Sequence, residues 1–435
     1  MFQLVKIKPA IPGAAPHNVL RSNHYKSTLK RLFTWKLAAS SVIIGLNLFS
    51  LNAQAPQVHS LNTHLFATAK VIASVVKKPT VLNVRVGEKD YNKTSAEARF
   101  YLKQGTEAYN TKMYAEAIKL LSAALNLQSN LTAAYEKRAL SYFKLDALTL
   151  AEKDFTKAID LDPRNSKLYS YRGSLYMQMQ HFYKATLDYS TWITLDTHNP
   201  KAYYYRGSAY LKIAEGKKAI ADFTDVLFHE PANEIAYYNR GVSKATVGDH
   251  LTAIGDFTRA VTLNKFLAQG FLSRAISHAE LDNHPAALAD IEKALTITPT
   301  YTEAYITQAV SLQKLNDLAA AKKALLKALA IDPLSSKAYY HLATVEKLLN
   351  NRAGAQNHYQ TSLRILSDEL FNDPKNPQHF SDRAQIYILF KDYANALADY
   401  KAAEALYITM GSQIHRARIQ KKITSVTQLS HSTPK

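Results

Sequence analysis

The residue pair with the clearest chemistry is an arginine followed by an aspartate at a fixed spacing of sixteen positions. It occurs six times, as Arg138 with Asp154, Arg172 with Asp188, Arg206 with Asp222, Arg240 with Asp256, Arg274 with Asp290, and Arg383 with Asp399. Guanidinium and carboxylate groups match as a bidentate fork. Where Gln104, Gln308 and Leu342 replace the arginine, the aspartate is replaced too. This joint loss predicts contact, and we interpret the six pairs as structural ion pairs between helices.

No other set of residues carries a recognisable catalytic or metal-binding pattern. His278, Glu280, Asp282 and His284 are the most metal-like stretch, but they span a predicted helix end and a turn, so their side chains should point in different directions. The chain contains no phosphate-cradling glycine loop, H-E-x-x-H motif or nucleophile elbow, and no cysteine. We therefore expect a protein without catalytic residues, metal or cofactor.

The pairs belong to an internal repeat of 34 residues that holds for eight repeats and resumes in a ninth after about seven extra residues. A small residue marks each repeat at Gly105, Ala139, Gly173, Gly207, Gly241, Ala275, Ala309, Ala343 and Ala384. An alanine follows twelve positions later, at Ala117, Ala151, Ala185, Ala219, Ala253, Ala287, Ala321, Ala355 and Ala396. An aromatic residue lies four positions before each marker, and prolines end several repeats, as at Pro163 and Pro231.

These positions predict a pair of helices in each repeat. Apolar residues recur at helical spacing in both halves. Small residues at matched positions let the two helices cross closely, and the prolines end the second helix. Because a two-helix repeat cannot bury its own apolar face, the repeats must stack.

This pattern resembles the tetratricopeptide repeat family over residues 98 to about 410. The resemblance implies an all-α, right-handed superhelical solenoid of about nine helix hairpins with a C-terminal capping helix. It also implies a concave groove, lined by the first helices, that binds extended peptides or partner helices. Carried onto this chain, the groove residues that we expect to contact a partner are Lys167, Tyr171, Lys201, Tyr204, Tyr205, Tyr238, Asn239 and Tyr340.

Tyrosine supplies rigid, amphipathic contact area, which interfaces favour. The third to fifth repeats have the densest tyrosines, and we expect them to bind a segment with apolar anchors and some acidic residues. The alternative is that some of these tyrosines only pack against neighbouring helices.

The net charge of +19 does not predict nucleic-acid binding once it is located. Residues 1–87 carry 11 Lys/Arg and no acid, and residues 411–435 carry 5 and no acid. The repeats between them are nearly neutral, with 38 basic against 35 acidic residues. Basic ends on a neutral solenoid are poor evidence for a phosphate-tracking surface, so nucleic acid is not an expected partner.

The first 55 residues have the pattern of an export signal. Basic residues precede an apolar run over residues 37–51, which ends in small residues around Ala53 and Ala55. The run is about 15 residues long, short for a membrane span. Cleavage after Ala53 and an uncleaved anchor through residues 37–51 are the two forms of this prediction. A mitochondrial presequence is the rival, because the stretch is basic and free of acids.

The predicted organisation is therefore a signal peptide or anchor over 1–55, a linker over 56–97, the solenoid over 98–410, and a capping helix with a disordered tail over 411–435. The predicted function is a non-enzymatic scaffold that binds protein segments, exported to the periplasm or medium or attached to the cell envelope. The alternatives are a mitochondrial membrane import or assembly factor that uses the same groove, and an enzyme with a hidden site in the solenoid or the linker.

Overall fold

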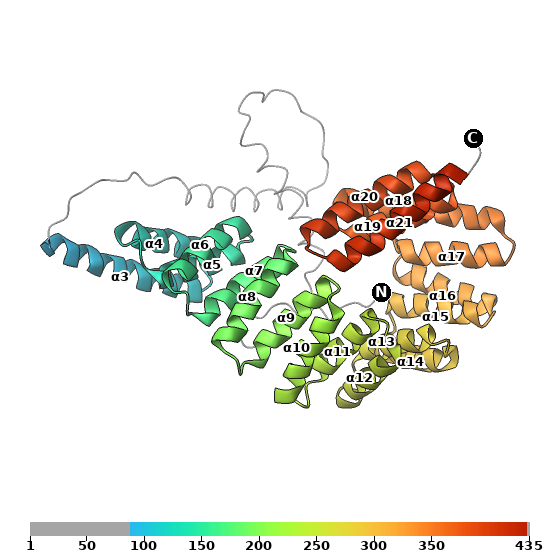
Figure 1. The fold of residues 1–435 in the computed structure, drawn as a ribbon, viewed down its shortest axis with the longest axis horizontal. Helices are drawn as coiled ribbons and strands as arrows, with labels where there is room; N and C mark the ends of the chain where they lie inside the picture. Colours follow the sequence, from blue (N-terminus) through green and yellow to red (C-terminus); the bar gives the residue numbers. More distant parts are fainter. Residues whose placement is uncertain (1–87, 433–435) are drawn as a thin grey trace, which may run out of the picture. The chain divides into compact units, whose positions relative to one another are not determined.

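The computed structural model describes residues 88–432, and every regular element in that range is an α-helix (Figure 1). The first helices of the nine repeats are α3 (Glu88–Asn110), α5 (Thr132–Lys144), α7 (Ser166–Gln178), α9 (Pro200–Lys212), α11 (Glu234–Thr246), α13 (Ala268–Glu280), α15 (Thr302–Lys314), α17 (Ser336–Leu348) and α19 (Pro377–Leu389). The second helices are α4 (Tyr114–Leu127), α6 (Leu148–Leu161), α8 (Phe182–Leu195), α10 (Gly216–His229), α12 (His250–Leu263), α14 (His284–Ile297), α16 (Leu318–Ile331), α18 (Arg352–Asn372) and α20 (Tyr393–Thr409). Helix α21 (Gln413–Ser432) follows the ninth repeat. The predicted all-α stack of nine hairpins with a closing helix is confirmed.

The described residues form two compact segments that divide inside α7. The N-terminal segment ends at Leu175, and the C-terminal segment begins at Tyr176. Within each segment a helix packs on the one before it and the one after it. Such a stack is stabilised by neighbour contacts, so its length is not limited by a single core.

The two helices of a repeat cross where the sequence places its small residues. The nine alanines of the second helices are at most 4% exposed. In the fifth repeat, a Cβ added to Gly241 would lie 2.7 Å from the ring of Phe257, which is itself fully buried. The glycine therefore makes room for a phenylalanine, because protein interiors leave no spare space at such a contact.

Each hairpin turn contains one residue with left-handed backbone. These residues are Lys112, Asp146, Gln180, Ala214, Gly248, Asp282, Asn316, Asn350 and Lys391, and Gly411 has the same role between α20 and α21. Asn, Asp and Gly tolerate this conformation best, and they occupy most of these positions from Gly248 onward. From the fifth repeat onward, the residue type at most of these turns therefore favours the chain reversal.

Two predicted boundaries are corrected by the structure. Helix α3 begins at Glu88, so the last ten residues of the predicted linker 56–97 are helical. The extra residues before the ninth repeat lengthen α18 to 21 residues, against 14 in α16. Helix α21 continues to Ser432, where a disordered tail was predicted. The predicted signal or anchor over 1–55 lies outside the described residues.

Candidate interaction surface

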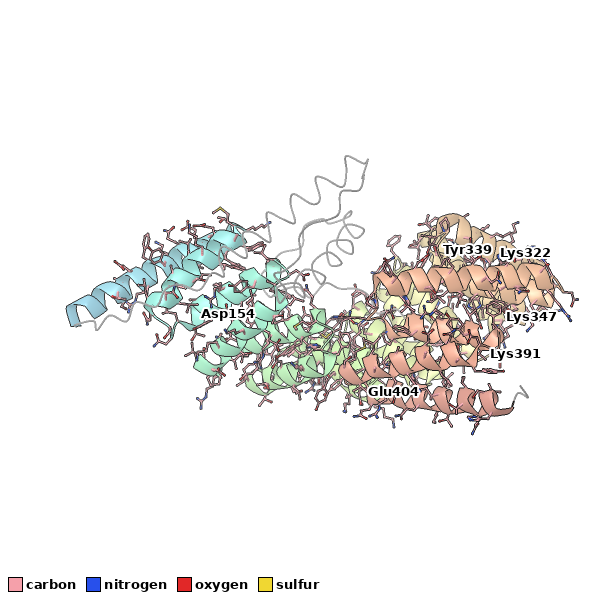
Figure 2. The ribbon with its side chains drawn as sticks, turned by 90° about the horizontal axis from the view of Figure 1, so that it is seen from above. Asp154, Lys322, Tyr339, Lys347, Lys391 and Glu404 are labelled. Atoms are coloured by element: carbon pink, nitrogen blue, oxygen red, sulfur yellow. The ribbon has the colours of Figure 1, made fainter. Side chains whose placement is uncertain are left out.

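In five of the six arginine–aspartate pairs, both residues belong to the same segment, and in each of these pairs the two side chains meet. Nε and Nη2 of the arginine donate to the two carboxylate oxygens at 2.7–3.0 Å. The aspartate side chains are only 3–7% exposed and the arginines 13–21%. Figure 2 labels one of these carboxylates, Asp154 on α6. Arg172 and Asp188 belong to different segments, and their pairing stays a prediction.

A third contact of each arginine was missed in the sequence. Its Nη1 donates to a hydroxyl on the second helix of the preceding repeat, at 2.9–3.3 Å. In the five repeats whose pair lies within one segment, one guanidinium therefore joins three helices. The acceptors are Ser122, Thr156, Ser190, Thr224, Thr258 and Ser367, each sixteen positions before its arginine. The signal was present in the sequence, because Glu292 and Leu326 replace the hydroxyl where Gln308 and Leu342 replace the arginine.

The guanidinium group of each arginine also contacts an aromatic ring. The ring three positions earlier lies 5.5–6.0 Å from the guanidinium carbon in all six repeats that carry the arginine, within range of a cation–π contact. The hydrogen bond to Asp256 raises the pKa of Arg240, and the one to Asp399 raises that of Arg383, although burial opposes both shifts. We call the series of arginines, with these aspartate, hydroxyl and aromatic contacts, the ladder.

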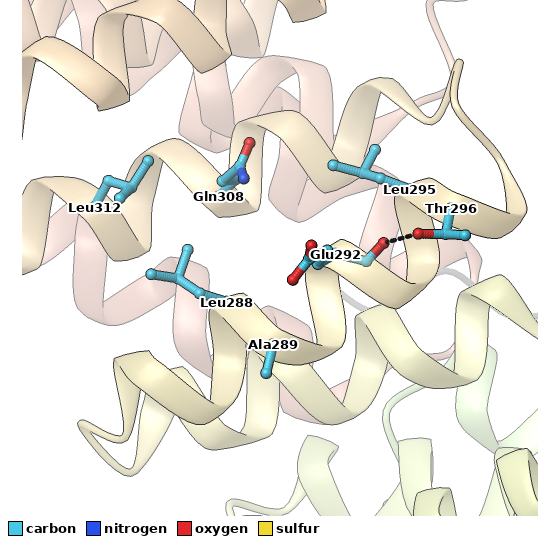
Figure 3. Close-up of a pocket in the computed structure, with 7 residues that line it drawn as sticks. All are labelled: Leu288, Ala289, Glu292, Leu295, Thr296, Gln308 and Leu312. Carbon is cyan, nitrogen blue, oxygen red and sulfur yellow. Dashed lines mark hydrogen bonds between the residues drawn. The ribbon is translucent and has the colours of Figure 1, made fainter.

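The ladder is interrupted in the seventh repeat, and a shallow open pocket lies there between α14 and α15 (Figure 3). Gln308 stands where an arginine would be, and Glu292 and Thr296 line the α14 side with Leu288 and Leu295. The hydroxyl of Thr296 donates to the backbone carbonyl of Glu292 at 2.8 Å. The pocket is the space that the missing arginine leaves.

The predicted groove residues differ in their access to solvent. Lys167 and Lys201 are exposed, and Tyr204, Tyr205 and Tyr340 are partly exposed. The structure corrects the prediction for the other three, because Tyr171 is 8% exposed and Tyr238 and Asn239 are each 1% exposed. The ring of Tyr171 packs against Phe155 of the preceding repeat, and the ring of Tyr238 packs against Phe257 of its own repeat. The ring centroids are about 6 Å apart in both pairs. These three residues belong to the core and offer a partner almost no surface.

In the C-terminal segment, side chains of consecutive first helices contact one another directly. The amide of Asn239 on α11 donates to the hydroxyl of Tyr204 on α9 at 3.3 Å. Lys337 on α17 lies 3.2 Å from Glu303 on α15. We call the face of the first helices that contains Lys201, Tyr204, Tyr205, Glu303, Lys337, Tyr340, His341 and Asp382 the first-helix strip. These contacts join first helices of neighbouring repeats at both ends of the strip.

The strip changes character along its length. In the fourth repeat Tyr205 stacks on Tyr189 and Trp192, with centroids 5.7 and 6.2 Å away, and burial raises the pKa of Tyr204 to about 12. In the eighth repeat burial, helped by Lys337, lowers the pKa of His341 to about 4. In the ninth, burial raises the pKa of Asp382, whose carboxylate accepts from Gln378 at 2.6 Å. The strip is thus aromatic at one end and polar at the other.

Two further properties of residues 88–432 bear on other functions. Within that range, no three His, Asp or Glu side chains are grouped so that they could hold a metal ion. No helix there is long and apolar enough to span a membrane.

The fold and its ladder define a class of protein, a stack of helical hairpins built from a 34-residue repeat. The family model for the tetratricopeptide repeat matches residues 132–165 and 302–333, which are the hairpins α5–α6 and α15–α16. With the same hairpin recurring nine times, eight of them in strict 34-residue register, the chain is a tetratricopeptide repeat protein, a class that serves as scaffolds for protein–protein interaction. No curated protein matches the sequence.

Several solved structures are similar to this chain. A tetratricopeptide repeat protein from Parabacteroides merdae is 17% identical, covers 54% of this chain and 93% of its own length, and has a TM-score of 0.49. The C-terminal part of a repeat protein from Cytophaga hutchinsonii is 22% identical, with 55% and 99% covered and a TM-score of 0.47. YrrB, described as a TPR protein with an unusual peptide-binding site, is 20% identical, with 42% and 95% covered and a TM-score of 0.39.

Proposed function

We propose that this chain is a non-enzymatic scaffold that binds an extended protein segment along the first-helix strip of its C-terminal segment. The observation that carries the proposal is the group of partly exposed tyrosines, Tyr204, Tyr205 and Tyr340, on first helices that contact their neighbours. Lys201 is exposed one helical turn before Tyr204 and Tyr205. Rigid aromatic side chains beside a cation favour a segment with apolar anchors and an acidic residue.

Peptide selection tests this proposal without knowledge of the natural partner. A display library of random peptides is selected on the parent chain, and we expect enrichment of sequences that combine aromatic or aliphatic residues with Asp or Glu. Tyr205→Ala and Lys201→Glu should weaken the enriched peptides at least tenfold, since aromatic anchors dominate such interfaces. Thermal unfolding of each variant shows whether its fold is kept.

Matched controls come from the second helices. Lys217 is exposed on α10, and Phe228 on the same helix is 81% exposed. Lys217→Glu and Phe228→Ala repeat the two chemical changes away from the strip and should alter the affinity less than twofold. If no peptide is enriched, or if the controls weaken binding as much as the strip variants, the proposal is wrong.

We further propose that the scaffold is exported or attached to the cell envelope, on the basis of the basic and apolar pattern in residues 1–55. N-terminal sequencing of the mature chain tests this. A start at Gln54 supports export with cleavage after Ala53, and persistence of Met1 in a membrane fraction supports an anchor. Recovery of the chain from mitochondria would favour the alternative of an import or assembly factor.

A further inference from the structure

Two turns that lie far apart in the sequence touch inside the C-terminal segment. The hydroxyl of Ser412, in the turn between α20 and α21, donates to the backbone carbonyl of Ile213 in the turn between α9 and α10, at 2.7 Å. Ser412 is 2% exposed. Its hydroxyl has one proton, so the contact of 2.9 Å with Nδ1 of His415 requires that the histidine donates. The turn that follows the ninth repeat thus contacts the turn inside the fourth repeat.

The α9–α10 turn is more deeply buried than the equivalent turns of the next four repeats. Ile213 and Ala214 are each 3% exposed. The residues that follow the first helix in the next four repeats, Val247, Leu281, Leu315 and Leu349, are 42–46% exposed. An apolar turn that is open to solvent in those repeats is covered in the fourth, where the α20–α21 turn lies against it.

Gly411 gives an independent sign that this approach is close. Its φ of 74° lies in the left-handed region, and a Cβ added there would come within 2.7 Å of Cβ of Tyr183 on α8. Gly248 has the same kind of backbone, with φ of 89°, but a Cβ there would meet nothing within 4 Å. Glycine is therefore favoured at position 411 both by the left-handed turn and by the close approach of α8, whereas at position 248 it is favoured only by the turn.

The turn that makes this contact is itself rigid. The rings of Tyr407 and His415 stack across it with centroids 4.7 Å apart. Arg416 and Gln420 of α21 both contact the carboxylate of Glu404 on α20, at 3.4 and 2.8 Å; Figure 2 labels Glu404. Helices α20 and α21 are thus joined by several side-chain contacts, whereas one hydrogen bond joins Ser412 to the α9–α10 turn.

We propose that the α20–α21 turn is a latch that closes the C-terminal segment on the α9–α10 turn, and that its opening admits a partner to the first-helix strip. Figure 1 shows α9, α11 and α13 nearer the middle of this segment than α10, α12 and α14. The first helices, which carry the strip, therefore lie on the inner side of this segment. The role in partner access rests on the proposed function, whereas the closure itself does not.

Distance measurement between two spin labels tests the closure. The chain has no cysteine, so Lys217→Cys and Gln413→Cys, both at exposed positions beside the two turns, carry the only labels. In the parent we expect one short, narrow distance distribution. Gly411→Asn keeps a residue that tolerates the left-handed turn but places a Cβ against Tyr183, and it should shift the distribution to longer, broader distances.

Gly248→Asn makes the same change at an open turn and should leave the distribution as in the parent. Ser412→Ala adds no atom and removes the hydrogen bond, so it should populate the long distances even if Gly411→Asn fails to fold. A long, broad distribution in the parent, or an unchanged one in both latch variants, would overturn the proposal.

The access role is tested with a peptide enriched on the parent. Opening the latch with Ser412→Ala should raise both the association and the dissociation rate at least threefold. A disulfide between the two cysteines introduced by Lys217→Cys and Gln413→Cys should lower both rates. Unchanged rates with a changed label distance would overturn the access role and leave the closure standing. If no peptide is enriched at all, the proposed function fails, and the label distances still decide whether the latch exists.

Discussion

At the scale of single residues, the ladder arginines are held more firmly than surface ion pairs usually are. Each of the five arginines paired within a segment makes a bidentate bond to an almost fully buried carboxylate, a hydroxyl contact to the preceding repeat and a contact with an aromatic ring, as Arg274 does. Exposed ion pairs are worth about 0–1 kcal/mol. Loss of one partner of a buried pair leaves an uncompensated charge and costs about 3–5 kcal/mol.

Arg274 and Asp290 are the best pair for a double-mutant cycle, because both bidentate distances are 2.7 Å and Arg274 is only 13% exposed. Asp290→Ala should lower the free energy of unfolding by about 3 kcal/mol or more, since it leaves the guanidinium unpaired. Arg274→Met, which keeps the aliphatic stem, should cost less when Asp290 is already absent. Strictly additive losses in urea unfolding would contradict the pairing.

At the scale of the helical element, the seventh repeat shows what the ladder contributes. It folds into the same hairpin as its neighbours although Gln308 and Ala324 occupy the ladder positions. The helix crossing is made by packing of small and apolar residues, so the ion pair does not create the hairpin. What it adds is a polar connection between three helices.

Transplanting the pair into this repeat tests that view. Ala324 is 4% exposed, so Ala324→Asp alone should destabilise by about 3 kcal/mol or more through an unpaired buried charge. Gln308→Arg alone should change stability by about 1 kcal/mol or less, because its only new partner is the exposed Glu292.

The double variant should recover most of the loss caused by Ala324→Asp, measured as the midpoint of chemical unfolding. If Gln308→Arg fails to rescue Ala324→Asp, the geometry of this crossing differs from that of the other repeats.

At the scale of the whole described chain, two partly exposed histidines with lowered pKa values couple stability to pH. Burial lowers the pKa of both His341 and His415 to about 4, from an ordinary value of 6.5. Below pH 6.5 the unfolded chain takes up these protons and the folded chain does not. Stability should therefore fall as the pH drops from 6.5 towards 4, by at most about 1.4 kcal/mol per pH unit for each histidine.

Unfolding midpoints at pH 7.5, 6.5, 5.5 and 4.5 measure this slope, and His341→Gln should reduce it. The carboxyl groups of Glu369 and Asp382 act in the opposite sense, because burial raises their pKa and the folded chain then binds their protons more readily. Their effect belongs to the lower part of the range. A stability that does not change between pH 6.5 and 5.5 would contradict the lowered pKa values of these two histidines.

The sequence by itself determined those parts of the structure that depend on contacts between adjacent repeats. The 34-residue period, the small residues at the crossings and the joint loss of Arg and Asp predicted the hairpins, their order and five ion pairs within the segments. The hydroxyl acceptors that the sequence analysis missed, such as Thr258, also lie at a fixed spacing of sixteen positions from their arginines. These features are local, because each repeat meets its neighbours in the same way.

Only the tertiary structure decided which first-helix tyrosines are buried and where the stack meets itself. Tyr204 and Tyr238 occupy the same position in successive repeats, yet Tyr204 is partly exposed and Tyr238 is 1% exposed. The contact between Ser412 and Ile213 joins residues 199 positions apart. Both depend on how small differences between repeats add up along the stack. That sum is a property of the whole assembly of helices, and no single repeat contains it.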